Sequence, residues 1–388
     1  MEGMVRYMDF KHPPEDQDII DMVRDFCLKE VQPIAAQLDE EERFPSESIR
    51  KLGEMGIMGL TFPEKYGGSG VSYVTYIATV AEIARHCAST SITVSAHSSL
   101  CCGPIYYYGT EEQREKYLTP LVRGEKLGAF GFTEPSAGTD GANQKTKAED
   151  KGDHWLINGN KIFITNAGYA DTFVITAVTD KEKGHRGLSM FIFEKDTPGF
   201  RLGVKEKKMG IRASSTCELI FEDMVVPKEN LLGELNRGYY QALSTFDSGR
   251  IGIGAQALGI AESAIEECTK YVMQRVQFGQ PIGHFQNTQF QLADMATRVE
   301  AARLLICRAA QARQDKEPFS HLAAQAKLFA SETATDVTRR CLQLVGGYGY
   351  TRDYPFERFM RDAKITEIYE GTSEVQRMVI ANNMGLNK

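Results

Sequence analysis

The spacing of apolar residues divides the chain into a helical part, a part rich in strands and a second helical part. From Pro13 to about Arg123, apolar residues recur every three or four positions, most clearly at Ile20, Val23, Cys27 and Val31. This spacing places them on one face of a helix, and Pro13-Pro14 stands where a helix can begin. The pattern predicts an N-terminal helical domain over residues 1–123.

Between about Gly124 and Gly233, short β-branched and aromatic runs alternate with Gly, Asn, Asp and Pro, which is typical of strands and turns. The runs at 173–178, 188–193 and 218–221 are expected strands. Asn158-Gly159-Asn160 separates the runs at 155–157 and 161–165 and predicts a hairpin turn between them. Residues 124–234 are therefore expected to form a middle antiparallel sheet, closed in the manner of a β-barrel.

From about Tyr239 the helical spacing returns, most clearly at Leu292, Met295, Val299, Ala302 and Ile306. Asp294 and Arg298 lie four positions apart on this helix and are expected to pair. Turns such as Gly279-Gln280-Pro281 would connect long antiparallel helices, so residues 235–388 are predicted to form a four-helix bundle. The fold class is α+β, with three domains.

Composition and charge exclude several classes of protein. A chain of 388 residues with 42% hydrophobic content can bury a core, which argues against disorder. A net charge of −7 argues against a nucleic-acid partner. Residues 1–11 lack the apolar stretch of a signal peptide, and no apolar run approaches the ~18 residues of a membrane span. We therefore expect a soluble, cytoplasmic protein without a membrane partner.

Cysteine and histidine give little support for metal or thiol chemistry. The eight cysteines include no CxxC pair, which suits buried thiols in a reducing cytosol better than a disulfide framework. The seven histidines include no HExxH motif. We expect neither a metal site nor a Cys-His nucleophile.

Three stretches combine glycine with polar and aromatic residues and are candidates for ligand binding. Residues 130–140 offer backbone N–H groups and hydroxyls to a polar ring or phosphate, although a turn-rich crossover between domains explains them equally well. The glycine cluster at 343–350 brings backbone close to a ligand or only ends a helix, and it does not fit a Rossmann nicotinamide site. In residues 361–377, Gly371 breaks the helix directly after Glu370 and lets that carboxylate project into a cleft.

Together these stretches resemble the acyl-CoA dehydrogenase family, flavoproteins with an N-terminal helical domain, a middle β domain and a C-terminal helical bundle. The resemblance covers essentially the whole chain and is strongest to the short-chain (butyryl-CoA) branch. It rests on motifs in family order: Lys65-Tyr66-Gly67-Gly68, Thr133-Glu134-Pro135, Lys161-Ile162-Phe163-Ile164-Thr165-Asn166, Gly249-Arg250-Ile251-Gly252-Ile253, Arg275-Val276-Gln277-Phe278-Gly279, Arg361-Asp362-Ala363-Lys364 and Tyr369-Glu370-Gly371-Thr372.

The resemblance implies that Glu370 is the catalytic base. In the family, a glutamate removes the α-proton of an acyl-CoA while a hydride leaves the β-carbon for N5 of FAD, which yields a 2,3-enoyl-CoA. One branch of the family carries its base at the position of Gly249, and glycine cannot act as a base. Loss of water around the Glu370 carboxylate is expected to raise its pKa towards the useful range.

The resemblance also implies an FAD site built from two sets of residues. The set that would border the isoalloxazine is Phe130, Phe132, Thr133, Gly138, Thr139, Phe163 and Thr165. The set that would approach the adenosine diphosphate from a neighbouring subunit is Arg275, Gln277, Phe278, Gln286, Gln343 and Gly347. Thr372 and Glu374 complete the surroundings of the cofactor. Sharing the site between subunits implies an obligate homo-oligomer, usually a tetramer.

For the acyl-CoA substrate, Asp247 and Arg250 match the family positions along the pantetheine and adenine portion. Tyr369 and Gly371 would lie beside the thioester, and Thr139 is assigned to the substrate as well as to FAD. Ser91 stands where short-chain relatives often carry glycine. Its bulk permits a short, branched or alicyclic acyl group, unless its hydroxyl only bonds within its own helix.

Several hypotheses about function stay open at this point. The leading one is a short-chain acyl-CoA dehydrogenase that passes electrons to an electron-transferring flavoprotein. If the same site works in the reverse direction, the protein is an enoyl-CoA reductase paired with a bifurcating flavoprotein. Rapid reaction of the substrate-reduced enzyme with oxygen would instead indicate an acyl-CoA oxidase. A family member that binds FAD and acyl-CoA without turnover is the non-enzymatic alternative. The acyl group, the direction and the electron partner are not identified by the residues.

Overall fold

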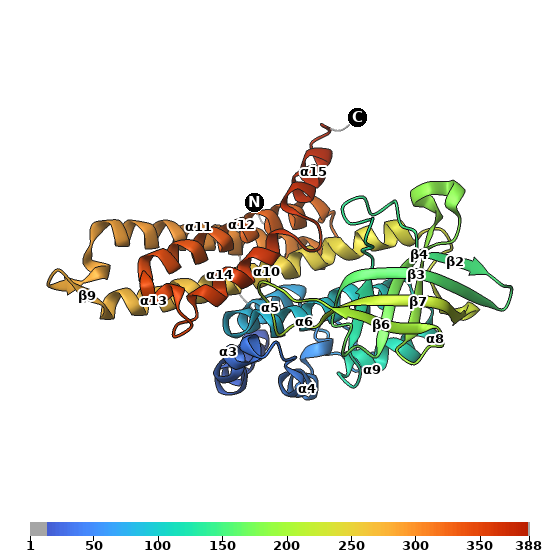
Figure 1. Ribbon diagram of the computed structural model, residues 1–388, viewed down its shortest axis with the longest axis horizontal. Helices are drawn as coiled ribbons and strands as arrows, with labels where there is room; N and C mark the ends of the chain where they lie inside the picture. Colours follow the sequence, from blue (N-terminus) through green and yellow to red (C-terminus); the bar gives the residue numbers. More distant parts are fainter. Residues whose placement is uncertain (1–13, 387–388) are drawn as a thin grey trace.

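The three parts predicted from the apolar spacing are present in the computed structural model, which describes residues 14–386 (Figure 1). The segment searched for a signal peptide, residues 1–11, and Pro13 lie outside the described residues. The β domain occupies one end of the elongated molecule, and the tip of the C-terminal bundle occupies the other (Figure 1).

The N-terminal part consists of short helices, and its core confirms the predicted helical face. Ile20, Val23, Cys27 and Val31 are all buried, because the helix is continued past Phe26 by a π-helical turn that keeps the same face inward. The elements are α2 (Pro14–Phe26), η1 (Cys27–Val31), α3 (Gln32–Glu40), α4 (Ser46–Glu54), η2 (Ile57–Gly59), η3 (Glu64–Tyr66), α5 (Tyr73–His86), α6 (Ala88–Ala96), η4 (His97–Cys102), α7 (Gly103–Tyr108), α8 (Glu111–Gln113), η5 (Arg114–Leu118) and α9 (Thr119–Val122).

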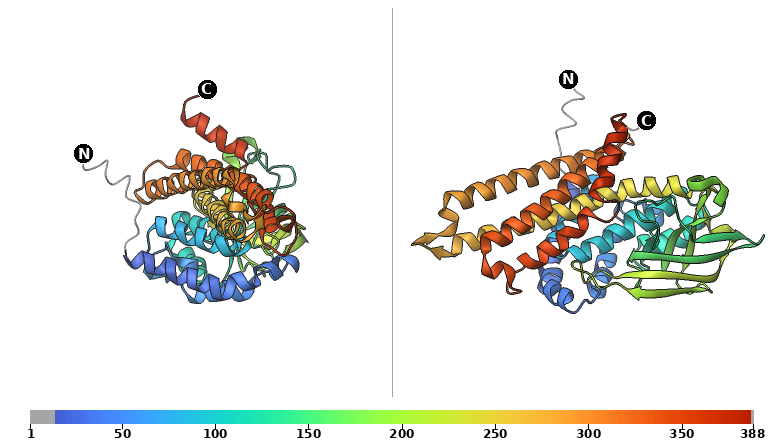
Figure 2. Two further views of the ribbon diagram at one scale, coloured as in Figure 1. Left: turned by 90° about the vertical axis from the view of Figure 1, so that its left-hand side faces the viewer. Right: turned by 45° about the horizontal axis from the view of Figure 1, so that its top comes forward.

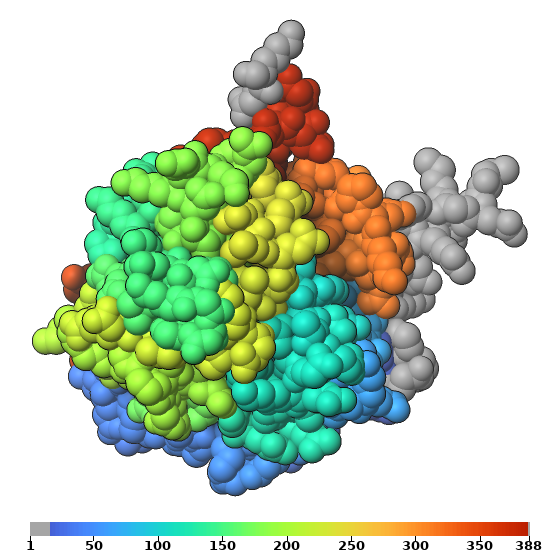
Figure 3. Space-filling view, turned by 90° about the vertical axis from the view of Figure 1, so that its right-hand side faces the viewer, coloured from blue at the N-terminus to red at the C-terminus, as the bar shows by residue number. Residues whose placement is uncertain are grey.

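The middle part is one eight-stranded sheet, mostly antiparallel, in the order β6-β7-β3-β2-β4-β5-β8. The remaining strand, β1, pairs with β4 in parallel, and a single β2–β4 bridge is also parallel. Figure 3 views the molecule from this end, with the N-terminal helices in blue and cyan beside the sheet. The elements are β1 (Gly128–Gly131), β2 (Lys147–Asp150), β3 (His154–Thr165), β4 (Thr172–Val178), η6 (Lys181–Gly187), β5 (Leu188–Glu194), β6 (Phe200–Lys205), β7 (Thr216–Pro227), η7 (Lys228–Asn230) and β8 (Leu231–Leu232).

The hairpin predicted at Asn158-Gly159-Asn160 is wrong, because these residues lie inside the single strand β3. The register of β3 against β7 shifts between Ile157 and Gly159, so the dipeptide forms a β-bulge. Gly159 has a φ of +139°, and Asn158 exchanges two side-chain hydrogen bonds with Asp223 of β7, at 2.9 and 2.8 Å. Asn158-Gly159 therefore forms a bulge within β3 and does not reverse the direction of the chain.

The C-terminal part is a bundle of long helices around α12, which packs against α10, α11 and α14. Met295, Val299, Ala302 and Ile306 of α11 are buried and Leu292 is half-buried, which confirms the predicted face. The elements are α10 (Gly238–Gln274), β9 (Val276–Gln277), β10 (Gln280–Pro281), η8 (Ile282–His284), α11 (Gln286–Gln314), α12 (Ser320–Val345), α13 (Gly347–Tyr350), α14 (Phe356–Lys364), η9 (Ile365–Glu367) and α15 (Ser373–Asn383).

The predicted pair between Asp294 and Arg298 on α11 does not form. Arg298 binds Asp336 of the neighbouring α12 at 3.1 Å, and Asp294 lies 3.8 Å from Arg340 of the same helix. Because α11 and α12 pack side by side, charged side chains of α12 lie within reach of Asp294 and Arg298. These contacts between helices replace the expected pair within α11.

The longest helix, α10, runs from the β domain to the β9–β10 hairpin at the far end of the bundle (Figures 1 and 2). The hairpin reverses at Phe278-Gly279, whose φ values of +53° and +79° are those of a type I′ turn. Any groups carried by the two ends of α10 are therefore separated by the full length of that helix.

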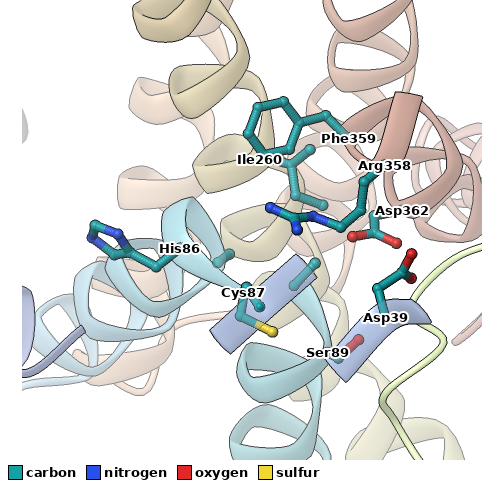
Figure 4. Close-up of a pocket in the computed structure, with 11 residues that line it drawn as sticks. Asp39, His86, Cys87, Ser89, Ile260, Arg358, Phe359 and Asp362 are labelled. Atoms are coloured by element: carbon teal, nitrogen blue, oxygen red, sulfur yellow. The ribbon is translucent and has the colours of Figure 1, made fainter. Parts of the chain in front are cut away.

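A network of charges joins the N-terminal helix α3 to α14 of the bundle. Arg361 of α14 holds the carboxylate of Asp39 with two bonds of 3.1 and 2.6 Å. Asp362 accepts a hydrogen bond from the backbone N–H of Ile211 at 2.5 Å, and burial together with Asp39 raises its pKa to about 6. Figure 4 shows Asp39 and Asp362 facing one another across a small cavity beside Arg358. This junction fixes the position of the chain segment that follows α14.

None of the helices between residues 14 and 386 is long and apolar enough to cross a membrane, α10 included. Over the same range, no group of three or more His, Cys, Asp or Glu side chains is placed to hold a metal ion. The cysteines are free thiols; Cys307 is half-buried and the others are buried.

Replacing Gly159 by alanine is expected to cost about 1–3 kcal/mol of folding stability, because an L-residue is strained at its φ. A Cβ at Gly159 would also lie 2.7 Å from the Cα and Oγ1 of Thr146. Thermal unfolding followed by circular dichroism measures the loss. Gly152→Ala is the matched control, since Gly152 also has a positive φ but has no atom within 4 Å of an added Cβ. Equal losses in the two variants would contradict the role given to the bulge contact.

Candidate functional site

The candidate site is built around the helix break at Glu370. The chain passes from α14 through the turn η9 to α15, whose N-cap is Thr372. Between them Glu370 and Gly371 have φ values of +52° and +96°, a region that glycine tolerates and glutamate rarely adopts. The predicted break after Glu370 is confirmed, and it turns the glutamate side chain towards α10.

The carboxylate of Glu370 packs against the backbone of α10 at Gly249. A Cβ added to Gly249 would lie 1.9 Å from Oε2 of Glu370 and 2.9 Å from Cδ2 of Leu100, so glycine provides the space that the carboxylate occupies. Oε2 is buried and has no hydrogen-bond partner among residues 14–386. Burying an unpartnered carboxylate oxygen opposes folding, and such a group in a protein interior calls for a functional explanation.

Two cations, Arg250 of α10 and Lys327 of α12, lie near this carboxylate and act on its charge. Burial raises the pKa of Glu370 to about 7, and the two cations oppose that rise. Burial also lowers the pKa of Lys327 to about 7, with Glu370 opposing the fall. A pKa near 7 is the condition for an efficient general base at neutral pH.

The residues predicted to contact CoA lie on α10 beside an open groove of about 720 Å³. Arg250 donates to Asp247 at 2.6 Å, and Ser320 donates to the same carboxylate at 2.9 Å. The Nε of Arg250 lies 3.5 Å from the carbonyl oxygen of Glu370, so the pair connects the groove to the glutamate. The groove is lined by Asp247, Lys316, Glu317, Pro318, Phe319, Ser320, His321, Val379, Asn382 and Asn383.

Two other residues predicted to contact the substrate, Tyr369 and Ser91, are bonded within the protein. The hydroxyl of Tyr369 donates to the Oε1 of Gln256, whose Nε2 donates to the carbonyl of Ala88 at 2.9 Å. Ser91 is buried, and its hydroxyl donates to the carbonyl of Val80 at 2.8 Å. That bond crosses from α6 to α5 and does not stay within the helix of Ser91. Gln256 was not predicted; its place in the apolar segment 251–260 of α10 is the feature that could have indicated it.

The residues predicted to border a flavin lie on the β domain, next to the start of α10. The rings of Phe130 and Phe132 stack at 6.5 Å, and both meet Phe246 of α10 edge-on, at 5.7 and 5.1 Å. Phe163 has a φ of +61°, and 58% of its surface is exposed. Gly138 has no atom within 4 Å of an added Cβ. Thr133 and Thr165 are half-buried and Thr139 is exposed, so aromatic faces, hydroxyls and open backbone are available together.

That combination fits a planar ring system with polar edges, because aromatic faces can stack on the ring and hydroxyls and N–H groups can meet its heteroatoms. The residues present therefore fit the FAD that the sequence resemblance implies.

The set predicted for the adenosine diphosphate lies at the opposite end of α10. Phe278, at the tip of the β9–β10 hairpin, is 94% exposed. The other members of the set are also exposed: Arg275, Gln277, Gln286, Gln343 and Gly347. Figures 1 and 2 show the hairpin and the β domain at opposite ends, so the two sets do not meet within one chain. Thr372 and Glu374 lie apart from both sets, at the start of α15, where Thr372 accepts from the N–H of Val375 at 3.4 Å.

A buried charge pair that the sequence patterns did not predict, Lys161 and Glu134, joins β3 to the segment around residues 130–140. Lys161 of β3 is fully buried and donates to Glu134 at 2.8 Å, to Gln144 at 2.8 Å and to the carbonyl of Phe132 at 3.2 Å. Burial lowers the pKa of Lys161 to about 8, and Glu134 opposes the shift. A lysine among the apolar residues of a strand was the available signal.

The second missed residue is Lys327 of α12. It lies on the alanine-rich face of the helix, where Ala323, Ala326 and Ala330 are buried, and it is itself buried. A lysine at this point of an apolar helical pattern is uncommon unless the charge is paired or used, and that feature alone could have indicated it.

Comparison with known proteins gives matches over nearly the whole chain. Residues 13–125, 129–224 and 236–385 match the family models described as the N-terminal, middle and C-terminal domains of acyl-CoA dehydrogenase. The chain is 54% identical over 377 residues to the short-chain specific acyl-CoA dehydrogenase of Clostridium acetobutylicum, which covers 97% of this chain and 100% of that protein.

Two solved structures are equally similar. The butyryl-CoA dehydrogenase of Megasphaera elsdenii is 50% identical with a TM-score of 0.96, over 97% of this chain and 100% of that one. A chain in a structure described as the electron transferring flavoprotein of Acidaminococcus fermentans, from work on flavin-based electron bifurcation, is 51% identical with a TM-score of 0.97. That match covers 98% of this chain and 100% of the other.

Replacing Lys161 by methionine is expected to cost about 3–5 kcal/mol of folding stability, because it leaves Glu134 buried without its cation. Lys161 holds the pKa of Glu134 below its ordinary value, so this stabilisation is present above about pH 4.5 and is lost as the pH falls through the lowered value. Chemical denaturation at neutral and acidic pH measures both effects. Lys147→Met removes the exposed pair with Glu149 as a control and should cost at most about 1 kcal/mol. A cost at Lys161 no larger than at Lys147 would contradict the expectation.

Proposed function

The chain belongs to the acyl-CoA dehydrogenase family, and on that premise we propose that it is an FAD-dependent dehydrogenase that forms a 2,3-enoyl-CoA from a short-chain acyl-CoA. The observation that carries the proposal is the Glu370 carboxylate, whose Oε2 is buried without a partner among the described residues and which Arg250 and Lys327 face. A pKa of about 7 lets this carboxylate act as a base at neutral pH and hold the proton afterwards.

In the proposed reaction, Oε2 of Glu370 takes the α-proton of the thioester, and the electron pair of the broken C–H bond forms the new double bond. FAD, when bound, supplies the acceptor for the hydride that leaves the β-carbon. The space beside Gly249 keeps the carboxylate against the wall of α10, and burial excludes water from Oε2. Exclusion of water strengthens the carboxylate as a base and orients it towards one substrate atom.

The groove beside Asp247 is the proposed path of the pantetheine and nucleotide of CoA. It extends from Lys316 and His321 to Asp247, whose partner Arg250 reaches the backbone of Glu370. The base and the thioester carbonyl would therefore meet where the groove ends. Gly371, directly after the base, and Tyr369 would border the thioester. Thr139 on the β domain is proposed to serve both substrate and cofactor.

The proposed acyl pocket ends among α5, α6 and α10. Gln256 of α10 is bonded to Tyr369 on one side and to the carbonyl of Ala88 on the other, and this bridge would cross the proposed pocket. The hydroxyl of Ser91 is bonded to α5, so Ser91 would contribute bulk and not a polar contact. Because the Gln256 side chain would close the far end of the pocket, the pocket would admit a short, branched or alicyclic acyl group in preference to a long chain.

We propose that FAD is shared between two copies of the chain in a homo-oligomer, as a tetramer. The aromatic and hydroxyl set on the β domain, which includes Phe163 and Thr133, would border the isoalloxazine. The exposed set around Arg275 and Phe278 would approach the diphosphate of the neighbouring copy, where a guanidinium suits a phosphate. Thr372 and Glu374 would complete the surroundings of the cofactor. The free, buried cysteines agree with a cytoplasmic location.

Electrons are proposed to pass from the reduced flavin to an electron-transferring flavoprotein. A second function, reduction of an enoyl-CoA by the same site, is favoured by the similarity to a chain from the electron-bifurcation work on Acidaminococcus fermentans. Groups around one flavin do not set the direction, since the redox partner does. Retention of Glu370, Asp247 and Arg250 counts against a family member without turnover.

The proposal is tested by anaerobic titration of the purified flavoprotein with straight, branched and cyclic acyl-CoAs, following the loss of flavin absorbance. Reduction by a short acyl-CoA supports it. No reduction by any thioester would favour a binding module, and rapid reaction of the reduced enzyme with oxygen would favour an oxidase.

Replacing Glu370 by glutamine is expected to slow flavin reduction by about 10²–10⁴-fold while the flavin stays bound, because the amide cannot accept the proton. Stopped-flow absorbance under anaerobic conditions measures the rate, and the visible spectrum reports the flavin. Glu300→Gln, at an exposed site on α11, should reduce at the wild-type rate. Full activity of the Glu370 variant would exclude it as the base.

A further inference from the structure

Lys327 is a buried lysine whose amino group contacts no carboxylate in the described part of the chain. It is 1% exposed on the inward face of α12. Among residues 14–386, no carboxylate oxygen lies within the 4.0 Å of a salt bridge to its Nζ. A buried lysine normally needs a paired charge or a dense set of acceptors, so its backbone contacts explain why it is there.

The two acceptors of Lys327 are carbonyls on either side of Glu370. Nζ donates to the carbonyl of Thr366 at 3.0 Å and to that of Gly371 at 2.7 Å. Ser331, one helical turn further along α12, donates to Thr366 at 2.9 Å, and Gln376 of α15 donates to Gly371 at 2.8 Å. Lys327 is thus the one described side chain that hydrogen-bonds to both ends of the loop.

That loop needs holding, because Glu370 is in the left-handed region. A glutamate persists at such a φ only where its surroundings determine the backbone path. With both flanking carbonyls bound to one ammonium group, relaxation of Glu370 towards an ordinary φ would break at least one charge-assisted hydrogen bond.

The charge of Lys327 also acts on Glu370. Four groups face that carboxylate: Arg250 and Lys327 as cations, and the hydroxyls of Tyr73 and Tyr369. Arg250 is in contact with Asp247 at 2.6 Å, which offsets its charge. Lys327 is faced by Glu370, Glu367 and Arg250 but has only carbonyls in contact. Its field on Glu370 is therefore not cancelled by a contacting anion.

We propose that Lys327 is the positioning residue of the base: it clamps both ends of the Glu370 loop and holds Glu370 in the ionised form that accepts the substrate proton. The inference rests on the proposed dehydrogenation and extends it to a residue outside the motifs of the site.

The test compares the wild-type flavoprotein with Lys327→Met, which removes both charge and donors, and with Lys327→Gln, which keeps a donor without charge. Anaerobic flavin reduction by saturating butyryl-CoA is followed by stopped flow between about pH 5.5 and 9. Removing a cation raises the pKa of a neighbouring carboxylate, so the rising limb of the profile should move to higher pH by about one unit in both variants. Lys327→Met should also reduce flavin about 10–100-fold more slowly at pH 7, and Lys327→Gln less so.

Lys364→Met is the matched control, since Lys364 precedes the same loop but is exposed and pairs with Glu367. It should keep the wild-type pH profile. If Lys327→Met slows flavin reduction equally at every pH, with no shift of the rising limb, Lys327 has a merely structural role and the proposal is overturned. A pH profile of Lys327→Met identical to that of the wild type would also overturn it. If Lys327→Met does not fold with bound flavin, the same criteria apply to Lys327→Gln. If no acyl-CoA reduces the flavin of the wild-type enzyme, the proposed function itself is overturned. The wild-type measurement therefore separates failure of the proposed function from failure of the Lys327 proposal.

Discussion

A carboxylate that is held out of water and still exchanges a proton near neutral pH is the constraint on which the C-terminal half of this protein depends. Burial alone would drive the pKa of Glu370 far upwards, and cations alone would drive it down. The observed balance requires both a dry position for Oε2 and positive charge close by. Gly249 on α10 meets the first requirement, and Arg250 and Lys327 meet the second.

This constraint explains why several helices of the bundle contact a strained segment. The loop at Glu370 has two successive residues at positive φ, so it gains nothing from local helix formation and depends on outside contacts. These come from α12, α10 and α15, while the Arg361–Asp39 contact fixes the preceding helix against the N-terminal domain. A base that must reach one substrate atom benefits from this, since small displacements of a catalytic group cost much of its effect.

Apolar spacing predicted the helical faces, because burial of one face is what that spacing measures, and β-branched and aromatic runs predicted β3, β4, β5 and β7 but not β1, β2, β6 and β8. It failed where a local signal competes with neighbouring elements. Asn158-Gly159 suits a turn and a bulge equally well, and only pairing with β7 decides between them. Arg298 pairs with Asp336 of α12 and not with Asp294 of its own helix. The helix break at Glu370 was predictable because Gly371 acts locally. Lys161 and Lys327 were not identified, since their partners lie 17 to 44 positions away in sequence.

The charge distribution, like the geometry, favours a cofactor site that two copies of the chain would share. The chain carries a net charge of −7, yet the proposed ligands, FAD and acyl-CoA, are themselves anionic. Binding then depends on cations placed at particular points against the overall field, and the predicted ones stand far apart along α10: Arg250 beside the groove and Arg275 at its far end. A single copy cannot bring Arg275 to a flavin on its own β domain, because α10 is a continuous helix between them. In the proposed arrangement a second copy would complete the cofactor site, and assembly of the oligomer would be a condition for binding FAD.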